Sequence, residues 1–234
     1  MSLDNYPPGD FGILVINQGA PFSTPLPPRF FIVNDNGKGL SRSRNLAIHH
    51  CKTRYMLLCD NDVRLLPGFE QHIQNATETY PNSAAITFKV RTPDGGDFKS
   101  YRRYSFPHNK LTACKACSIE IVVDREKIGS VRFDEQFGLG AAYPVGEENI
   151  FLSDLLFCRK SVIYWPEYIC EHPEFSSGAL LDKNAYFLRG KVFFRIFGKK
   201  GLVVGTLFWC KKEKFRLNSI PKLAAFFSGY LKGL

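Results

Sequence analysis

The chain has 234 residues and a mass of 26.6 kDa, and 44% of its residues are hydrophobic. This length and apolar content allow one sizeable core and exclude a disordered chain. The formal charge is +9, and the excess of positive charge lies at the C-terminal end. Residues 189–234 contain eleven Lys or Arg and one acid, Glu213, so the residues before this segment are close to neutral.

The basic C-terminal segment also contains the apolar stretches VFFRIF, LVVGTLFW and LAAFFSGYL. This mixture is typical of amphipathic helices that lie on an anionic membrane surface or against an acidic partner. Two alternatives stay open, namely a nucleic-acid site and the solvated basic faces of ordinary packed helices. We expect no nucleic-acid partner, because no nucleic-acid-binding motif accompanies the charge.

The seven cysteines are scattered along the chain, and its first residues do not resemble a signal peptide. We therefore expect reduced thiols in a cytoplasmic protein. The basic C-terminal segment adds the expectation that the protein is peripheral to the inner face of the membrane. Cys114 and Cys117 form a CxxC pair, but no second pair follows at the spacing of a zinc site, and the surrounding LTACKACSIEIVV predicts a strand. No apolar run approaches the roughly 20 residues of a membrane-spanning helix.

Strand and helix signals alternate in the first part of the chain. Compact apolar runs predict the strands, and helical spacing with nearby capping residues predicts the helices between them. In chain order the predicted elements are a strand at 11–19, a proline-rich loop at 21–29, a strand at 29–35, a helix at 40–52, a strand at 54–62, a helix at 67–80 and a strand at 83–90. This order indicates an α/β fold with a mostly parallel sheet flanked by helices.

The pattern changes after residue 90. The polar and aromatic segment that follows predicts an excursion from the core. A strand followed by a basic turn over 117–128, a helix at 147–158 and a strand that begins at 161 and ends in Glu171 and His172 complete the series. We divide the chain into a globular domain, 1–188, and a basic amphipathic helical extension, 189–234.

Two carboxylates, Asp60 and Asp62, end the apolar strand in the sequence LLCDNDVRLLPG. Ligands of parallel sheets bind outside the carboxyl ends of the strands. If the backbone stays extended there, both carboxylates point to one side and can share a divalent cation. The alternative is that Asp60 caps a turn and Asp62 faces water.

The stretch GLSRSRNLAIHHCKTRYMLLCDNDVRLLPGFE resembles the core of family 2 glycosyltransferases, in which an Arg-Asn helix start is followed by a strand that ends in Asp-x-Asp and then by a proline. The later stretch RFDEQFGLGAAYPVGEENIFLSDLL resembles the second signature of that family, a Phe-Asp-Glu segment followed by paired acids that open a helix. The resemblance covers residues 13–172. It implies a GT-A fold and transfer of a sugar from a nucleotide donor, with inversion at the anomeric carbon.

The resemblance also implies roles for particular residues. Asp62 would bind the Mn²⁺ or Mg²⁺ that bridges the donor diphosphate, with His172 as a second metal ligand, and Asp60 would approach the ribose or the water shell of the metal. Glu148 would be the catalytic base, and Arg44 would reach the nucleotide or its phosphates. The structural alternatives are a His that only packs, glutamates that only complement the helix dipole, and a surface Arg.

Three further residues lie in the second signature. Asp134 and Glu135 are expected to shape the loop that receives the acceptor, and Tyr143 is expected to line the acceptor site. The chain also departs from the family pattern, because it lacks the usual first strand, whose end holds the nucleotide base. The stretch ILVINQGA takes the place of a later strand and has Asn17 and Gln18 where acids are common.

The sequence therefore predicts a metal-dependent, inverting glycosyltransferase with a nucleotide-sugar donor, expected to be UDP-linked. Its acceptor would be a glycan or a lipid-linked molecule in surface or capsular polysaccharide synthesis. Two alternatives stay open. The missing first strand would suit a degenerate, non-catalytic binding or assembly module, whereas a nucleotidyltransferase would need a basic glycine-rich loop that NQGAPFSTPLPP does not supply.

Overall fold

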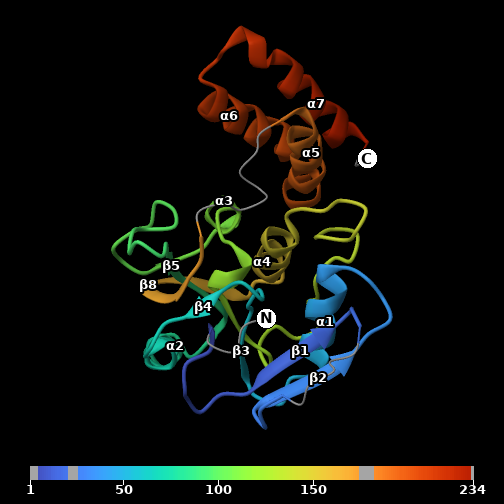
Figure 1. Ribbon diagram of the computed structural model, residues 1–234. Coiled ribbons are helices and arrows are strands. Elements are labelled where there is room, and N and C mark those ends of the chain that lie inside the picture. The colour runs from blue at the N-terminus through green and yellow to red at the C-terminus, as the bar shows by residue number, and fades with distance from the viewer. Residues whose placement is uncertain (1–4, 21–25, 174–181, 233–234) are drawn as a thin grey trace.

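The computed structural model describes residues 5–20, 26–173 and 182–232 (Figure 1). Most of the loop predicted at 21–29 lies outside these residues. The strands are β1 (Ile13–Asn17), β2 (Phe30–Asn34), β3 (Tyr55–Leu57), β4 (Arg64–Leu65), β5 (Ser83–Arg91), β6 (Phe106–Pro107), β7 (Ile121–Asp124) and β8 (Ser161–Glu171). The helices are α1 (Leu40–His50), α2 (Phe69–Thr79), α3 (Lys110–Ala113), α4 (Glu147–Phe157), α5 (Lys183–Phe197), α6 (Gly201–Glu213) and α7 (Ile220–Leu231).

The strands form two sheets. β1 and β2 pair in parallel as a separate two-stranded sheet, and the other strands form a six-stranded sheet in the order β3-β7-β5-β8-β4, with β6 also paired to β8. β3, β5 and β8 run in one direction, as the strand-helix alternation predicted, and β5 pairs with β8 in parallel.

The prediction of a mostly parallel sheet was wrong for the pairing of neighbouring strands. β7 lies between β3 and β5 and is antiparallel to both, and β4 and β6 are antiparallel to β8. β7 is buried on both faces, and such a strand shows the same apolar run in either direction. Its direction is therefore set by the connections of the chain and not by its local sequence.

Two apolar layers cover the six-stranded sheet because the side chains of its strands alternate between faces. On one face Ala85 of β5 and Val123 of β7 pack with Ile48 of α1 and Phe151 of α4. The opposite face packs against α2 and the β1–β2 sheet, and it includes Phe88, Val122, Phe69, Ala76, Phe30 and Ile13. Helix α4 is thereby held with its N-terminus beside α1.

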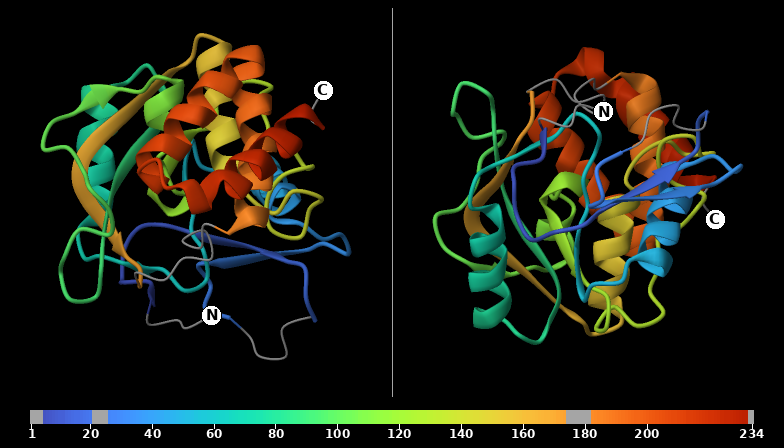
Figure 2. Two further views of the ribbon diagram at one scale, coloured as in Figure 1. Left: turned by 90° about the horizontal axis from the view of Figure 1, so that it is seen from above. Right: turned by 60° about the horizontal axis from the view of Figure 1, so that its bottom comes forward.

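The predicted helical extension is present as α5, α6 and α7, which form a layer at the opposite end of the molecule from β1 and β2 (Figure 1). α5 begins at Lys183 and packs beside α4, as the view from above shows (Figure 2). Tyr186, Trp209, Phe226 and Tyr230 form a small core of their own between the three helices. In the part of the chain that the structure describes, none of the helices is both long enough and apolar enough to cross a bilayer.

Candidate active site

Arg44 lies at the centre of the predicted site, on the second turn of α1. The helix begins after Gly39, whose φ of 115° suits glycine, and its first turn is tied to a distant loop because Ser41 Oγ donates to the carbonyl oxygen of Phe137. Arg44 is buried, with 6% of its surface exposed. Its guanidinium therefore needs anionic partners from other segments.

Arg44 finds these partners in both sequence motifs. Its Nη1 donates to Glu147 Oε1 at 2.7 Å, and its Nη2 lies 3.5 Å from Asp60 Oδ1. Nη2 is buried and has no hydrogen bond within the described residues. The acidic residues near positions 60 and 147 therefore converge on one guanidinium, and one of its nitrogen atoms still has hydrogen-bonding capacity.

Asp60 and Asp62 follow β3, but the strand ends earlier than predicted. β3 stops at Leu57, and a turn follows in which the amide of Val63 donates to the carbonyl oxygen of Asp60. The expectation that strand alternation aligns the two carboxylates was therefore wrong. Instead Asp60 is oriented by Arg44 and by Ser118 Oγ, which donates to its Oδ2 at 3.4 Å.

Asp62 faces His172, which follows β8. Oδ2 of Asp62 lies 3.4 Å from Nε2 of His172, and the carboxylate is 63% exposed whereas the imidazole is mostly buried. Nδ1 of His172 lies 2.7 Å from the carbonyl oxygen of Pro173, which can only accept a hydrogen bond. In the neutral imidazole Nδ1 therefore carries the proton, and the lone pair of Nε2 faces Asp62.

This pair of residues fits a divalent cation. Two acceptor atoms 3.4 Å apart can both reach one ion at bond lengths of about 2.1 Å, and a hydrogen bond on the far nitrogen is the usual support of a histidine ligand. Within the residues that the structure describes, no three His, Cys, Asp or Glu side chains are grouped to hold a metal ion. Asp62 and His172 would therefore need phosphate oxygens or water to complete the coordination, which is common for Mg²⁺.

Glu147 and Glu148 open α4, as predicted. Glu147 is buried and paired with Arg44, whereas Glu148 is half-buried and has no salt bridge to any described residue. Burial raises the pKa of Glu148 well above its usual range, and the neighbouring charge of Glu147 raises it further, while Arg44 opposes both effects. A carboxyl with a raised pKa is suited to accept a proton near neutral pH.

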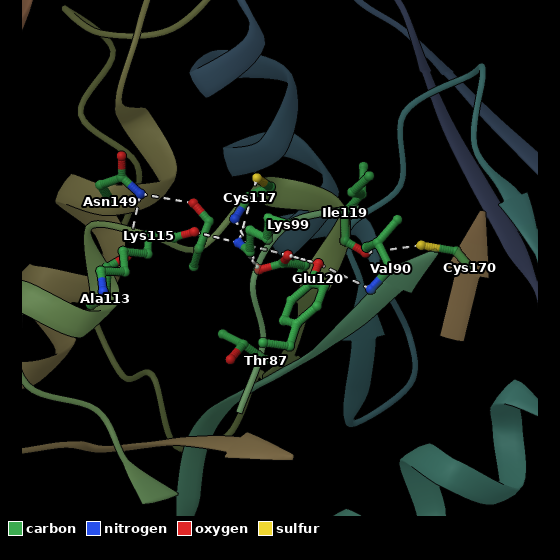
Figure 3. Close-up of polar contacts among 12 residues, drawn as sticks. Thr87, Val90, Lys99, Ala113, Lys115, Cys117, Ile119, Glu120, Asn149 and Cys170 are labelled. Carbon is green, nitrogen blue, oxygen red and sulfur yellow. Dashed lines mark hydrogen bonds and ion pairs between the residues drawn. The ribbon is translucent and has the colours of Figure 1, made fainter. Parts of the chain in front are cut away.

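The segment between α3 and β7 connects these groups, and its sequence did not reveal that role. The strand predicted over LTACKACSIEIVV was wrong for its first half, which forms α3 and a 3₁₀ turn at Ser118–Glu120. Asn149, next to Glu148, donates to the carbonyl oxygens of Ala113 and Ala116 (Figure 3). The segment therefore links the N-terminus of α4 to Ser118 and, through it, to Asp60.

A buried carboxylate holds the other end of this segment. Glu120 accepts hydrogen bonds from Lys99 Nζ at 2.8 Å, Tyr101 Oη at 2.5 Å and the amide of Cys117 at 3.1 Å (Figure 3). Lys99 and Tyr101 come from the excursion after β5, which also places Phe98 against the His172 ring at 5.5 Å. No motif signalled Glu120 or Lys99, because their pairing depends on residues that are distant in the sequence.

The remaining predicted residues are also located. Asp134 accepts a hydrogen bond from Arg195 of α5, and Glu135 accepts one from Asn45 of α1. The ring of Tyr143 lies 5.1 Å from that of Phe137 and under the ammonium of Lys191 at 5.0 Å. The contacts of Asp134, Glu135 and Lys191 join the glycine-rich segment to α5 and α1, whereas the contact between Tyr143 and Phe137 lies within that segment.

Asn17 and Gln18 lie near the start of α1 and bind neighbouring polar groups. Asn17 Nδ2 donates to Asn34 Oδ1, and Gln18 Nε2 donates to Asp35 Oδ2. Hydrogen bonds from Arg42 lower the pKa of Asp35 far below its usual range, with smaller contributions from Gln18 and the amide of Gly37. A carboxylate is thus present beside Gln18, although the sequence of β1 itself has none.

A separate hollow of about 620 Å³ lies between α4 and α5 and includes Lys110, Asp154, Phe157 and Arg195 in its lining. It contains none of the predicted site residues.

A comparison with family models identifies a match to Glycosyl transferase family 2 over residues 15–142, which is more than half of the chain. A comparison with curated proteins identifies no match. The matched range includes α1, the Asp-x-Asp turn and the loop up to residue 142, just before Tyr143. Glu148 and His172 lie beyond it.

Solved structures with a similar fold include TarS of S. aureus. Residues 1–349 of TarS match with a TM-score of 0.63 and 11% identity, over 98% of this chain and 73% of that chain. The TarS complex with UDP-GlcNAc matches with a TM-score of 0.59 and 10% identity, over 88% of this chain and 65% of that chain. Full TarS matches with a TM-score of 0.62 and 9% identity, and the chain spans 45% of its length. Together with the family match, this similarity confirms the predicted GT-A α/β fold with a helical extension.

Proposed function

This chain belongs to glycosyl transferase family 2, and we propose that it transfers a sugar from a UDP-linked donor to a glycan or lipid-linked acceptor with inversion at the anomeric carbon. The observation that carries the proposal is the position of Arg44, which contacts Asp60 of the first motif and Glu147 of the second. Arg44 and Glu147, which are 103 positions apart in the sequence, thereby meet, and Glu148 is the next residue after Glu147.

The donor is proposed from two observations. Two of the similar TarS structures are complexes, one with UDP-GlcNAc and one with UDP, and this chain has a similar fold. In this chain Nη2 of Arg44 is buried without a hydrogen bond, which is costly unless an anionic oxygen binds there. A diphosphate supplies such oxygens.

Asp62 and His172 are the residues that would hold Mn²⁺ or Mg²⁺. The ion, when bound, would stabilise the negative charge that develops on the departing nucleotide. Asp60 would orient the ribose or a metal-bound water, and Ser118 would fix its carboxylate.

Glu148 is proposed as the base. The acceptor hydroxyl forms a bond to the anomeric carbon of the sugar while the bond from that carbon to the nucleotide diphosphate breaks, and the hydroxyl proton passes to a carboxylate oxygen of Glu148. The N-terminus of α4 favours negative charge at this position, whereas burial and Glu147 raise its affinity for the proton. Glu147 is unsuited to the role because its Oε1 is already engaged by Arg44.

The acceptor is proposed to belong to surface or capsular polysaccharide synthesis, and the loop around Tyr143 is proposed to receive it. This loop is attached to α5 through Lys191 and Arg195, so the helical extension supports the acceptor side of the site. We also propose that the boundary between the catalytic domain and this extension lies at residues 188–189, within α5.

Isothermal titration calorimetry with UDP tests the donor site. We expect UDP to bind in the presence of Mn²⁺. Asp62→Asn should weaken that binding by about tenfold or more, because even the loss of a residue that only supports a metal ligand usually lowers metal affinity by about 10–100-fold. Glu126→Gln is the matched control, since Glu126 is 70% exposed and is paired only at the surface with Arg54. Binding of UDP that does not need the metal would contradict the role of Asp62, and no binding by the unaltered chain would favour the degenerate, non-catalytic module.

A further inference from the structure

Large apolar side chains are exposed along one edge of the helical extension. They lie on α6, in the turn between α6 and α7 and at the start of α7, and we call this set the tail edge: Leu202, Val203, Leu207, Phe215, Leu217 and Ile220. Phe215 and Leu217 are 71% and 82% exposed. Exposed apolar residues are common one at a time, but several of them along one helix and the turn that follows it are typical of a contact surface.

The backbone of the turn supports this reading. Lys214 and Phe215 have φ angles of 51° and 58°, the left-handed region that residues with a Cβ rarely adopt. The ring of Phe215 lies edge-on to that of Trp209, with 6.3 Å between the ring centroids, and most of the residue is exposed. Lys214 is the C-cap of α6, and the turn that it starts presents the apolar ring of Phe215 outward.

The charges around the tail edge have one sign. Among the residues of the extension that the structure describes, the exposed cations are Lys199 and Lys200 just before α6, Lys211 and Lys212 at its end, and Lys214 and Arg216 in the turn that follows. Glu213 is not available to balance them, because it accepts hydrogen bonds from Tyr186 Oη and from Lys222 Nζ at 2.9 Å each. The surface therefore combines apolar side chains with uncompensated positive charge.

We propose that the tail edge binds an anionic lipid bilayer, with Phe215, Leu217 and Ile220 inserted among the acyl chains near the headgroups and the flanking lysines on the lipid phosphates. Interfacial helices use this combination, since the apolar side chains supply insertion and the cations supply attraction to the surface. This proposal specifies which face of the extension meets the membrane, and it does not depend on catalysis.

Two other occupants fit the tail edge less well. A symmetric dimer would bring the same surface of two copies together and place lysines of like charge against each other without carboxylates to pair them. Nucleic acid would match the charge, but Phe215 is the one aromatic ring among the six side chains of the tail edge, too few for a series of stacked bases. A lipid bilayer satisfies both the charge and the apolar side chains.

The position of the tail edge adds a consequence for the site. α6 and α7 lie at the end of the molecule away from β1 and β2 (Figure 1), and α5 is joined to the catalytic domain by Arg195, which donates to both Asp134 and Asp154. A protein bound through the tail edge would hold the loop around Tyr143 at a fixed height above the lipid surface. This arrangement suits a lipid-linked acceptor.

Vesicle co-sedimentation of the full chain tests the proposal in the absence of any nucleotide sugar, so that failure of the proposed enzyme function does not affect the result. We expect binding to vesicles of phosphatidylcholine with phosphatidylglycerol and little binding to phosphatidylcholine alone. The double variant F215S/L217S is expected to lower the partition coefficient by about tenfold or more, because two inserted side chains are lost. The matched control is L111S/F157S, which removes two apolar side chains that are exposed on other elements, and it should bind as the unaltered chain does.

A fluorescence measurement separates insertion from adsorption by charge alone. When anionic vesicles are added, the emission of the indole introduced by Phe215→Trp should shift to the blue. Lipids with brominated acyl chains should quench this emission. Three results would overturn the proposal: no binding of the unaltered chain to anionic vesicles, equal binding of F215S/L217S, or an indole that stays in water. A dimer of the unaltered chain that F215S/L217S converts to a monomer would also overturn it and assign the tail edge to self-association.

Discussion

At the scale of single residues, Arg44 is the group on which the site depends. Its guanidinium is buried with Glu147 and lies beside Asp60, so its removal would leave a buried carboxylate without a partner. Losing one partner of a buried ion pair costs about 3–5 kcal/mol of folding free energy. We expect Arg44→Met to lower the free energy of unfolding by this amount, as measured by urea denaturation.

The matched control for Arg44→Met is Arg64→Met. Arg64 is 68% exposed and lies 3.6 Å from Glu171, which keeps Arg91 as a partner, and a surface ion pair of this kind contributes only about 0–1 kcal/mol. Equal losses in the two variants would show that Arg44 is not the connection between the two motifs.

The raised pKa of Glu148 predicts how activity changes with pH. Only the deprotonated carboxylate accepts the acceptor proton, so transfer should rise with pH as Glu148 ionises, and a raised pKa places this rise above the usual range of a glutamate. Glu147→Gln removes the neighbouring negative charge and lowers the pKa of Glu148, while keeping an oxygen for Arg44. We expect the acid limb of the initial rate to move to lower pH in this variant. An acid limb at the same pH in both proteins would exclude Glu148 as the group that controls it.

The candidate site was only partly predictable at this scale. Asp60, Asp62 and Glu148 could be identified because each lies in a local motif, and His172 because it follows the last strand. The pairing of Arg44 with Glu147 could not be predicted, since it joins residues that are 103 positions apart and depends on how α1 and α4 pack. The same applies to Glu120, whose partners come from the excursion after β5.

At the scale of elements, the crossing of α5 and α7 is set by glycines. A Cβ at Gly229 would lie 1.9 Å from the carbonyl oxygen of Phe187, and one at Gly190 would lie 2.2 Å from that of Phe226. Neither oxygen can move without shifting a helix. The two helices therefore approach at a distance that only glycine permits.

Gly229→Ala should disrupt this crossing. Overpacking of this kind costs about 1–3 kcal/mol, and we expect a corresponding fall in the free energy of unfolding by chemical denaturation. Ser228→Ala, at the adjacent exposed position, is the matched control and should change the free energy by less than about 0.5 kcal/mol. A Gly229→Ala protein as stable as the control would mean that α5 and α7 do not cross so closely.

The helices next to the site were predicted well because each combines apolar spacing with a clear start. The predictions at 40–52, 67–80 and 147–158 correspond to α1, α2 and α4 within a few residues. α3 was missed because four residues give no periodicity. The direction of β7 was missed because a strand buried on both faces has the same pattern in either direction.

At the scale of the whole molecule, the chain combines a GT-A domain with a basic helical layer that is attached to the loop proposed to receive the acceptor. The composition predicted this extension, because the charge and the apolar stretches are both concentrated there. The packing of its three helices around Tyr186, Phe226 and Tyr230, and the outward position of Phe215, required the coordinates. The attachment through Lys191 and Arg195 makes the extension part of the proposed catalytic unit.

Release of UDP from a UDP-sugar donor by Glu148→Gln, measured together with UDP binding, tests most directly whether the acids that meet at Arg44 form a catalytic site. The account predicts that UDP release falls by about 10²–10⁴-fold, the usual contribution of a general base, while the affinity for UDP with Mn²⁺ stays within about twofold. Glu126→Gln should retain both properties. Full turnover by Glu148→Gln would contradict the account.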